Sequence, residues 1–330
     1  MRRFLFLISI SSIIPVFSQP SISGAGYSSP VPLRVAPGQV ITLFVQAPDS
    51  QLTDPVSAPE GLPLPAMLAG VSVDYLQGAD HPAAIKEVRP ISSCLGIPQP
   101  AGGTCTTILA VTAQLPFEML TLCPLCGRLD IPAFLSVSVD GVASALQSVQ
   151  PLSDQAHILT TCDVIVAHST SRPNSAFPCP PMVKHADGAL VSAANPAAVG
   201  EQLAAYALGL GQTDPPLADG QPAADAFPTQ TVFAIDFNYR PNALATQPLG
   251  PSFIGPPGGY PTPLFTGAVA GFVGLYEIDF VVPPAPDGLI GCVDRAAVTP
   301  YSVIVQSNLT VSIGSPFSFD GVGICVAAGG

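Results

Sequence analysis

The chain has 330 residues, of which 48% are hydrophobic and only 10% are charged, so it has enough apolar material for a large core and wholesale disorder is excluded. Its formal net charge of −12 gives no support for binding to a phosphate backbone, and we expect no nucleic-acid partner. The 39 prolines and 30 glycines disfavour long helices and favour short strands joined by turns.

The first 18 residues are typical of a secretory signal peptide. Arg2 and Arg3 precede an apolar run over residues 4–17, and the small Ser18 is followed by the polar Gln19. We expect cleavage near Ser18 and a secreted protein, extracellular or periplasmic, whose formal charge changes from −12 to −14 because two arginines are lost. A membrane anchor needs about 20 apolar residues, and no later segment has the length or apolarity of a membrane span.

Strands are predicted where apolar and polar residues alternate, because successive side chains of a strand point to opposite faces. In the first half this pattern covers residues 71–75 and 135–139. In the second half it covers residues 276–282, and a further stretch of alternation runs over 301–305 and 309–313. Such short strands with turns between them indicate an all-β sandwich.

An internal duplication is visible when the two halves are aligned. Residues 37–40 (PGQV) match residues 199–202 (VGEQ), and residues 109–116 match 276–283 in period and in the final proline. The period of about 160 to 170 residues indicates two domains rather than a solenoid. Residues 202–208 are alanine-rich and resemble a short helix, but their counterpart in the first half is β-branched, so we predict a strand in both.

These patterns predict the following organisation. Residues 1–18 are the signal peptide, 19–153 a divergent first sandwich, 154–182 a Pro/Cys-rich connector, and 183–330 a second sandwich. Within the second half, the Pro/Gly-rich residues 242–263 are expected to form an exposed loop or flap.

Eight cysteines in a chain with a secretory leader are expected to form disulfides. Loop length alone favours local bridges, although eight cysteines allow 105 connectivities. The predicted pairs are Cys94 with Cys105, Cys123 with Cys126, Cys162 with Cys179, and Cys292 with Cys325.

The second half contains a set of motifs that resembles a known domain. They are HADGALVSAANPA at residues 185–197, Gly200, YALGLG at 206–211, Gly220 in the turn after Thr213, and GLYEIDFVVP at 274–283. Together they resemble the uncharacterised C-terminal domain common in secreted proteins of Solibacter-type acidobacteria.

That resemblance covers roughly residues 180–315 and implies an immunoglobulin-like β-sandwich with no assigned activity and no catalytic residues to carry over. The first half looks like a divergent copy, which has Gln46-Ala47-Pro48 in place of the Gly-Leu-Gly stretch.

The recurring glycines are predicted to be structural turn residues. Gly209 and Gly211 flank Leu210 at a strand end, where they would supply a positive φ or a bulge. They do not form a phosphate cradle, because neither a helix nor a Lys-Ser/Thr pair follows them. The full set of predicted turn residues is Gly200, Gly209, Gly211, Gly220, Gly274 and Pro283.

Two cysteine-based chemistries are weighed against disulfide formation. The C-x-x-C pair Cys123 and Cys126 could exchange thiols, but it lacks the strand-to-helix context that lowers a thiol pKa. Zinc could be held by cysteines and histidines of one segment, but their spacing departs from the usual knuckle. That segment contains Cys162, His168, Cys179 and His185.

Hydrolysis and calcium binding have weak support. A catalytic triad would have to be assembled across loops from His81, His157, His168 or His185, and there is no Gly-x-Ser-x-Gly elbow. Three aspartates near Gly220 have the oxygen chemistry that calcium prefers without the spacing of an EF-hand, so calcium binding stays open. They are Asp214, Asp219 and Asp225.

The sequence therefore predicts an all-β protein of two tandem immunoglobulin-like β-sandwich domains, exported and disulfide-bonded, with no enzyme activity and no cofactor. The first hypothesis is a secreted binding or structural module for an unknown protein or polysaccharide. The second is an extracellular hydrolase or carbohydrate-active protein with a loop-built site. A pocket in which two carboxylates, or a serine and a histidine, converge within hydrogen-bond reach would favour the second.

Overall fold

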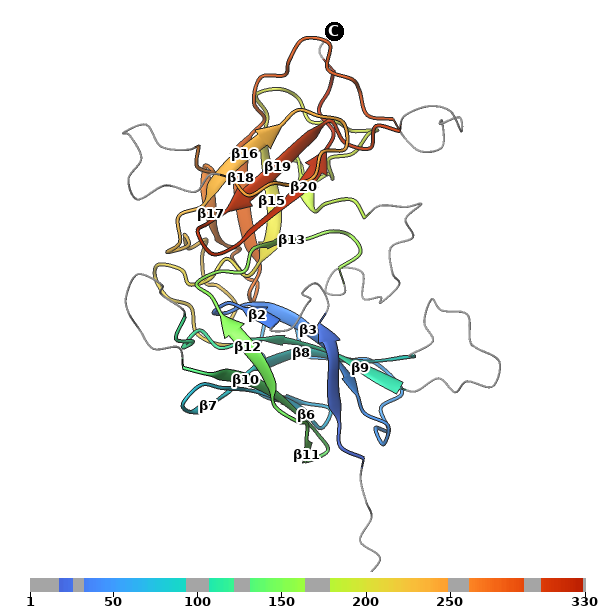
Figure 1. The fold of residues 1–330 in the computed structure, drawn as a ribbon, viewed down its shortest axis with the longest axis vertical. Coiled ribbons are helices and arrows are strands. Elements are labelled where there is room, and N and C mark those ends of the chain that lie inside the picture. The colour runs from blue at the N-terminus through green and yellow to red at the C-terminus, as the bar shows by residue number, and fades with distance from the viewer. Residues whose placement is uncertain are drawn as a thin grey trace, which may run out of the picture.

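The computed structural model describes residues 18–25, 33–92, 107–121, 131–163, 179–248, 261–293 and 304–328. Every regular element in these ranges is a β-strand, which confirms the all-β prediction. The strands form two sandwiches that lie end to end, the first in blue to green and the second in yellow to red except for the green β13 (Figure 1). The predicted signal peptide lies outside the described residues except for Ser18.

The first sandwich packs two sheets around one core. One sheet has the order β1-β3-β9-β8-β4, with bounds Ser21–Ala25, Val40–Gln46, Thr107–Gln114, Ala84–Ser92 and Val56–Ser57. The other has the order β2-β12-β10-β6-β5, with bounds Leu33–Val35, Gln147–Pro151, Ala133–Val139, Val71–Leu76 and Met67–Leu68. Two short strands extend the second sheet, β11 (Val142–Ala143) beside β10 and β7 (Asp80–Pro82) beside β6.

Alternation in the sequence explains how β6 and β10 face the core. Val73 and Val137 pair across the two antiparallel strands and are fully buried, while the intervening serines and aspartate face outward. Tyr75 is also fully buried and donates its hydroxyl to Gln77, which satisfies its polar end. The strands predicted at 71–75 and 135–139 are thus confirmed.

The second sandwich has the same two-layer plan. One sheet has the order β13-β15-β18-β17, with bounds His157–Ile158, Gln202–Leu208, Tyr276–Val281 and Phe265–Ala268, and β14 (Val183–Lys184) shares an edge of β15. The other sheet has the order β16-β19-β20, with bounds Ala234–Asn238, Leu309–Gly314 and Phe319–Ile324. Residues 202–208 and 276–281 are therefore strands, as predicted, and the alternation at 309–313 forms β19, whereas residues 304–308 are not in a strand.

The segment predicted as a connector, residues 154–182, contributes to the second sandwich. Its described part contains β13, which pairs with β15, and Ala156 and Ile158 lie in the second core. Only two residues pair, which is too short for a two-residue period to be recognised in the sequence. Residues 154–158 therefore belong to the second sandwich as well as joining the two.

The described part of the predicted flap is an irregular segment in which Asn242, Leu244, Thr246 and Gln247 are exposed, as expected, and it also packs on a sheet. Thr310 of β19 donates its hydroxyl to the Ala243 carbonyl, and a Cβ added to Gly321 of β20 would contact Ala245. Residues 243–248 therefore cover the outer face of the β16-β19-β20 sheet, which explains why β19 is buried on both faces.

The duplication inferred from sequence is reproduced in the strand register. Val40 pairs with Gln114 between β3 and β9, and Gln202 pairs with Val281 between β15 and β18. These are the same pairs that the sequence alignment of the two halves superposes. The two central strand pairs are therefore equivalent residue by residue.

The turn before each central strand is also repeated. In the first copy the Ala36 amide donates to the Gln39 side chain at 2.8 Å, and in the second the Ala198 amide donates to Glu201 at 2.8 Å. Upstream of this turn, Leu152 donates its amide to the Val35 carbonyl, and Ala327 donates to Ala197, each at 2.8 Å and each between parallel segments.

Strand order is shared by the two sandwiches. The sheets β1-β3-β9-β8 and β13-β15-β18-β17 both have the order of strands A, B, E and D in immunoglobulin domains, and β6, β10 and β12 and then β16, β19 and β20 occupy the places of C, F and G.

The two sandwiches contact each other through the loop after β15. Gly220 donates its amide to the Gln114 side chain at 2.7 Å, and Phe117 donates its amide to Asp219 at 2.8 Å. Gln212 donates its side-chain amide to the Phe117 carbonyl at 2.9 Å. A small apolar cluster of Val40, Leu159 and Leu208 adds burial at the same junction.

Two of the predicted disulfides are present. Cys162 is bonded to Cys179 with a Cα–Cα distance of 5.4 Å, and Cys292 is bonded to Cys325 with a distance of 5.8 Å, which confirms both pairings. The pairings predicted for Cys94 with Cys105 and for Cys123 with Cys126 lie outside the described residues. No helix in the described ranges could cross a membrane.

Candidate functional site

The outer face of the β14-β15-β18-β17 sheet carries a cluster of polar and aromatic side chains. Because Tyr276, Ile278 and Phe280 of β18 point into the core, Glu277 and Asp279 point outward. They border a depression of about 400 Å³. Its lining residues are Lys184, His185, Ala186, Gly188, Gln202, Leu203, Ala204, Tyr206, Glu277 and Asp279. We call this depression the sheet-face site.

The two carboxyl groups of the sheet-face site lie two residues apart on one face of β18, and Asp279 affects the ionisation of Glu277. Burial raises the pKa of Glu277, and the hydrogen bond and negative charge of Asp279 raise it further, to about 7. Close like charges cannot both ionise cheaply, so the pair holds one proton near neutral pH. Gln202 approaches from β15, with its side-chain amide 3.5 Å from the Asp279 carboxylate.

Tyr206 lies directly opposite Glu277 on the neighbouring strand. The Lys184 ammonium lies over the Tyr206 ring, 5.1 Å from its centroid, in a cation–π contact. Burial raises the pKa of the Tyr206 hydroxyl, and the charges of Glu277 and Asp279 raise it further. Tyr206 therefore contacts the ammonium through its ring and is affected by the carboxyl pair at its hydroxyl.

A second aromatic residue flanks the carboxyl pair on the other side. Phe265 of β17 is opposite Asp279, and Gly267 is opposite Glu277. A Cβ added to Gly267 would meet the Phe265 ring, so the ring extends over the glycine. The carboxyl pair therefore lies between two half-buried aromatic side chains on an open sheet face.

His185 closes one end of the sheet-face site. Its ring donates from Nδ1 to Glu201 at 2.6 Å, and its Nε2 lies 3.2 Å from the Asn195 carbonyl. Burial acts to lower the pKa of His185, but the hydrogen bonds to Glu201 and Asn195 and the charges of Glu201 and Asp187 together outweigh it and raise the pKa. Glu201 also accepts the Ala198 amide in the turn before β15. His185 is therefore held in place by a residue of the turn that both sandwiches share.

The equivalent face of the first sandwich has different chemistry. Phe44 and Ala110 occupy the places of Tyr206 and Glu277. Thr42 and Thr112, at the next pair along, are buried, and their hydroxyls are hydrogen-bonded to each other at 2.9 Å. Only the second copy therefore presents a carboxyl pair on this face.

A larger depression of about 490 Å³ lies beside both disulfides. It is bordered by Cys179, Cys325, prolines and aliphatic side chains, and none of its lining residues is titratable. The sheet-face site holds the convergent polar groups and the raised pKa that mark functional sites, so it is the better candidate.

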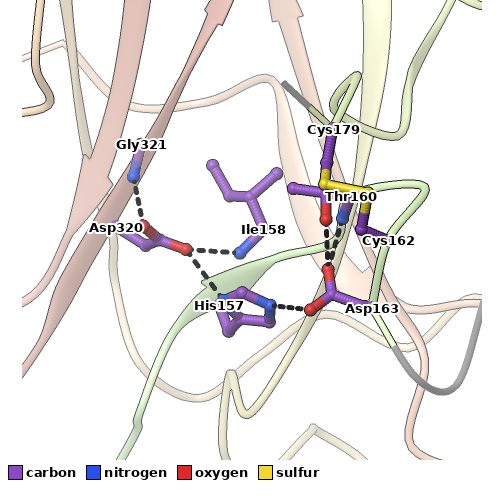
Figure 2. A network of polar contacts seen from close by, with 8 residues as sticks. All are labelled: His157, Ile158, Thr160, Cys162, Asp163, Cys179, Asp320 and Gly321. Atoms are coloured by element: carbon purple, nitrogen blue, oxygen red, sulfur yellow. Dashed lines mark hydrogen bonds and ion pairs between the residues drawn. A yellow bond between two sulfur atoms is a disulfide. The ribbon is translucent and has the colours of Figure 1, made fainter. Parts of the chain in front are cut away.

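His157 is the centre of a separate polar network in the second sandwich (Figure 2). Its Nε2 lies 3.0 Å from Asp163, and its Nδ1 lies 3.2 Å from Asp320. Asp163 also accepts hydrogen bonds from the amide and the hydroxyl of Thr160, and Asp320 accepts one from the Ile158 amide. The network joins β13 to β20 next to the Cys162 bridge.

Both ring nitrogens of His157 face carboxylates, so the ring is an imidazolium. Burial acts to lower the pKa of His157, but the hydrogen bonds and charges of Asp163 and Asp320 outweigh it and raise the pKa to about 9. Burial likewise acts to raise the pKa of Asp163, yet its bonds to His157 and Thr160 hold that pKa below the usual value. A charged ring with both nitrogens engaged cannot accept a proton from a nucleophile, so this network is structural.

Asp154 forms another buried network near the junction of the sandwiches. It is fully buried, and Ser315 donates its hydroxyl to the carboxylate at 2.8 Å while Ser318 donates a second hydrogen bond. Burial raises the pKa of Asp154 to about 6, although the two serine hydrogen bonds oppose the shift.

Because this carboxyl group is harder to ionise in the folded state, its contribution to stability is fully present below about pH 4 and is lost as the pH rises through about 6. We expect the free energy of unfolding to fall relative to an Asp154→Asn variant by roughly 3 kcal/mol between pH 4 and pH 7. Urea unfolding followed by circular dichroism at each pH measures the difference. A constant difference across this range would contradict the assignment.

The remaining predicted residues are dispersed. Cys162 and Cys179 form a disulfide and therefore cannot be zinc thiolates, which corrects the zinc alternative; His168, Cys123 and Cys126 lie outside the described residues. In the described ranges no three His, Cys, Asp or Glu residues form a metal-binding group.

Each of the three aspartates considered for calcium has a different setting. Asp219 accepts the Phe117 amide, and burial followed by the neighbouring Glu118 raises its pKa to about 6. Asp225 accepts the amide of Ala226 next to it, and Asp214 precedes a cis proline.

The predicted turn glycines all have positive φ: Gly200, Gly209, Gly211, Gly220 and Gly274. At Gly209 and Gly211 close approach adds to this need, since a Cβ would collide with the carbonyl oxygens of Gln155 and Ser153 respectively. Pro283 follows β18, and its carbonyl accepts the Tyr239 hydroxyl at 2.7 Å.

Sequence reasoning missed the sheet-face site. Glu277 and Asp279 belong to the alternating pattern of β18. That pattern identifies the buried face of the strand and does not indicate that the outward side chains form a site. An available signal was the pair of carboxylates two residues apart, which places both on one face of a strand.

No protein-family model and no curated protein matches this chain. Among solved structures, the chain is similar to one titled "Anomalous substructure of Titin-A168169", with 9% sequence identity and a TM-score of 0.17. That alignment covers 95% of this chain and 100% of the other. A TM-score this low supports no statement about fold or function.

Proposed function

We propose that this protein is an exported, non-catalytic binding protein that binds a polysaccharide on the sheet-face site. The observation that carries the proposal is the carboxyl pair of Glu277 and Asp279, set between Tyr206 and Phe265 in an open depression of about 400 Å³. Carboxylates accept hydrogen bonds from sugar hydroxyls, and aromatic rings pack on the apolar C–H faces of sugar rings. A depression of this volume is within the range of ligand sites.

The architecture supports the same proposal. The strand order of both sandwiches is that of immunoglobulin-like domains, and residues 180–315 resemble an exported domain with that fold. Two disulfides fit an oxidising compartment. Export after cleavage near Ser18 would place the sheet-face site among extracellular polymers.

The experiment is an array of glycans and matrix polymers probed with the mature chain. We expect binding to at least one polysaccharide, and we expect Tyr206→Ala to weaken that binding about tenfold or more. Phe272→Ala is the matched control, because Phe272 is an exposed aromatic residue of the same sandwich outside the site. Binding to no polysaccharide, or equal binding by Tyr206→Ala and wild type, would reject the proposal.

A second candidate function is glycoside hydrolysis. The observation that favours it is the convergence of two carboxyl groups, one with a pKa of about 7. Glycosidases, however, use two carboxyl groups that flank the scissile bond, whereas these two lie side by side on one face of a single strand. New reducing ends released from a bound polymer, and absent with Glu277→Gln, would establish hydrolysis.

A further inference from the structure

The sheet-face site contains more acid than base. Lys184 and His185 are the cationic residues of its lining, and His185 is paired with Glu201. Among the lining residues, Lys184 then leaves one positive charge against the two carboxyl groups of Glu277 and Asp279. When both carboxyl groups ionise, one negative charge is left without a counter-charge, and the structure relieves this by holding a proton between them.

The position of Lys184 indicates which chemical group the site can bind. Its ammonium lies over the Tyr206 ring, whose hydroxyl is within the electrostatic reach of both carboxylates. The ring face therefore already stabilises one ammonium group beside the carboxyl pair's strand. Lys184 comes from the two-residue strand β14 at the rim, so its long side chain can move aside.

We propose that the sheet-face site recognises sugar rings that carry free primary ammonium groups, as in polymers of de-N-acetylated 2-amino sugars. This inference rests on the proposed polysaccharide binding and names the substrate class. The ammonium of the sugar occupies the place between the Tyr206 ring and the Glu277–Asp279 pair, and its hydroxyls bond Gln202 and the carboxylates. The mature chain's charge of −14, which is the full-chain −12 without Arg2 and Arg3, attracts such a cationic polymer.

A lysine-rich protein is the competing source of ammonium groups. The structure favours the sugar, because Tyr206 and Phe265 lie on opposite sides of the carboxyl pair and present ring surfaces to a flat ligand. A lysine side chain has no ring to cover both.

Binding should release a proton. An ammonium ion placed beside the carboxyl pair takes over the role of the shared proton, which is then lost to solvent. No covalent bond changes, and the charge of the site is balanced before and after binding.

The test is calorimetry of the mature chain at pH 6 with hexamers of one β-1,4 backbone that differ at C2: glucosamine, N-acetylglucosamine and glucose. A lysine hexapeptide is the fourth ligand. We expect the glucosamine hexamer to bind about tenfold or more tightly than the other three. Titrations in buffers with different ionisation enthalpies should show proton release with this ligand only.

The double variant Glu277→Gln/Asp279→Asn should remove the preference for glucosamine and the proton release, while circular dichroism shows an unchanged fold. Its control is Asp225→Asn/Asp287→Asn, which removes two carboxyl groups, and at least as much negative charge, from exposed positions of the same sandwich. We expect this control to keep the preference.

Each other outcome overturns the inference. Equal binding of the three sugars would leave polysaccharide binding in place and reject ammonium recognition, whereas binding of no sugar would reject both. Lysine peptide binding as tight as that of glucosamine would assign the site to a protein partner. Loss of the preference in the control variant would show that overall charge, and not the sheet-face site, attracts the polymer.

Discussion

Replacing His157 with alanine is expected to lower the free energy of unfolding by roughly 3 kcal/mol, because Asp163 and Asp320 would lose the cation that faces both of them. The amide of Ile158 and the hydroxyl of Thr160 would keep their carboxylate partners. Urea unfolding followed by far-ultraviolet circular dichroism suits a chain without tryptophan.

The same network predicts a pH dependence. Since the pKa of His157 is raised to about 9 from about 6.5 in the unfolded chain, its stabilisation is fully present below pH 6.5 and is lost as the pH rises through about 9. A His157→Gln variant cannot carry the charge and should lack this loss, whereas His81→Gln in the first sandwich should retain it. An unchanged alkaline loss in His157→Gln would refute the assignment.

Gly211→Ala is expected to cost about 3 kcal/mol or more. Its φ of +85° disfavours a residue with a Cβ, and the added Cβ would collide with the carbonyl oxygen of Ser153. Gly188→Ala is the matched control, because Gly188 has the same φ of +85° and has open space around the added atom.

The control substitution should cost only about 1 to 2 kcal/mol, the price of the backbone conformation alone. Thermal unfolding of both variants beside wild type gives the comparison. Equal losses at the two positions would show that the contact with Ser153 has no energetic weight.

The strands and their register were predictable because the information is local. Alternation in β6, β10 and β18 identifies the buried face directly, and the alignment of the two halves even predicts that the pairs Val40–Gln114 and Gln202–Val281 are equivalent. Cysteine pairing within 17 and 33 residues was predictable for the same reason.

Long-range polar contacts were not predictable from these patterns. Tyr206 and Glu277 are opposite each other only because β15 pairs with β18, and His157 meets Asp320 only because the sandwich closes. The two residues of each pair are far apart in the sequence, so no short motif predicts that they are in contact. The glycines of the Gly-Leu-Gly stretch have a positive φ at the end of β15, but their contact with residues 153–155 depends on the segment that enters the second sandwich.

Ala110 and Thr112 stand in the first sandwich where the second has Glu277 and Asp279, so the carboxyl pair occurs once in the duplicated fold. If the sheet-face site binds a polymer as proposed, each chain offers one subsite on this face and not two. A single protein chain would then bind one polymer strand and would not cross-link it to a second strand. Any gain in affinity from multivalent binding would require several protein chains on one polymer.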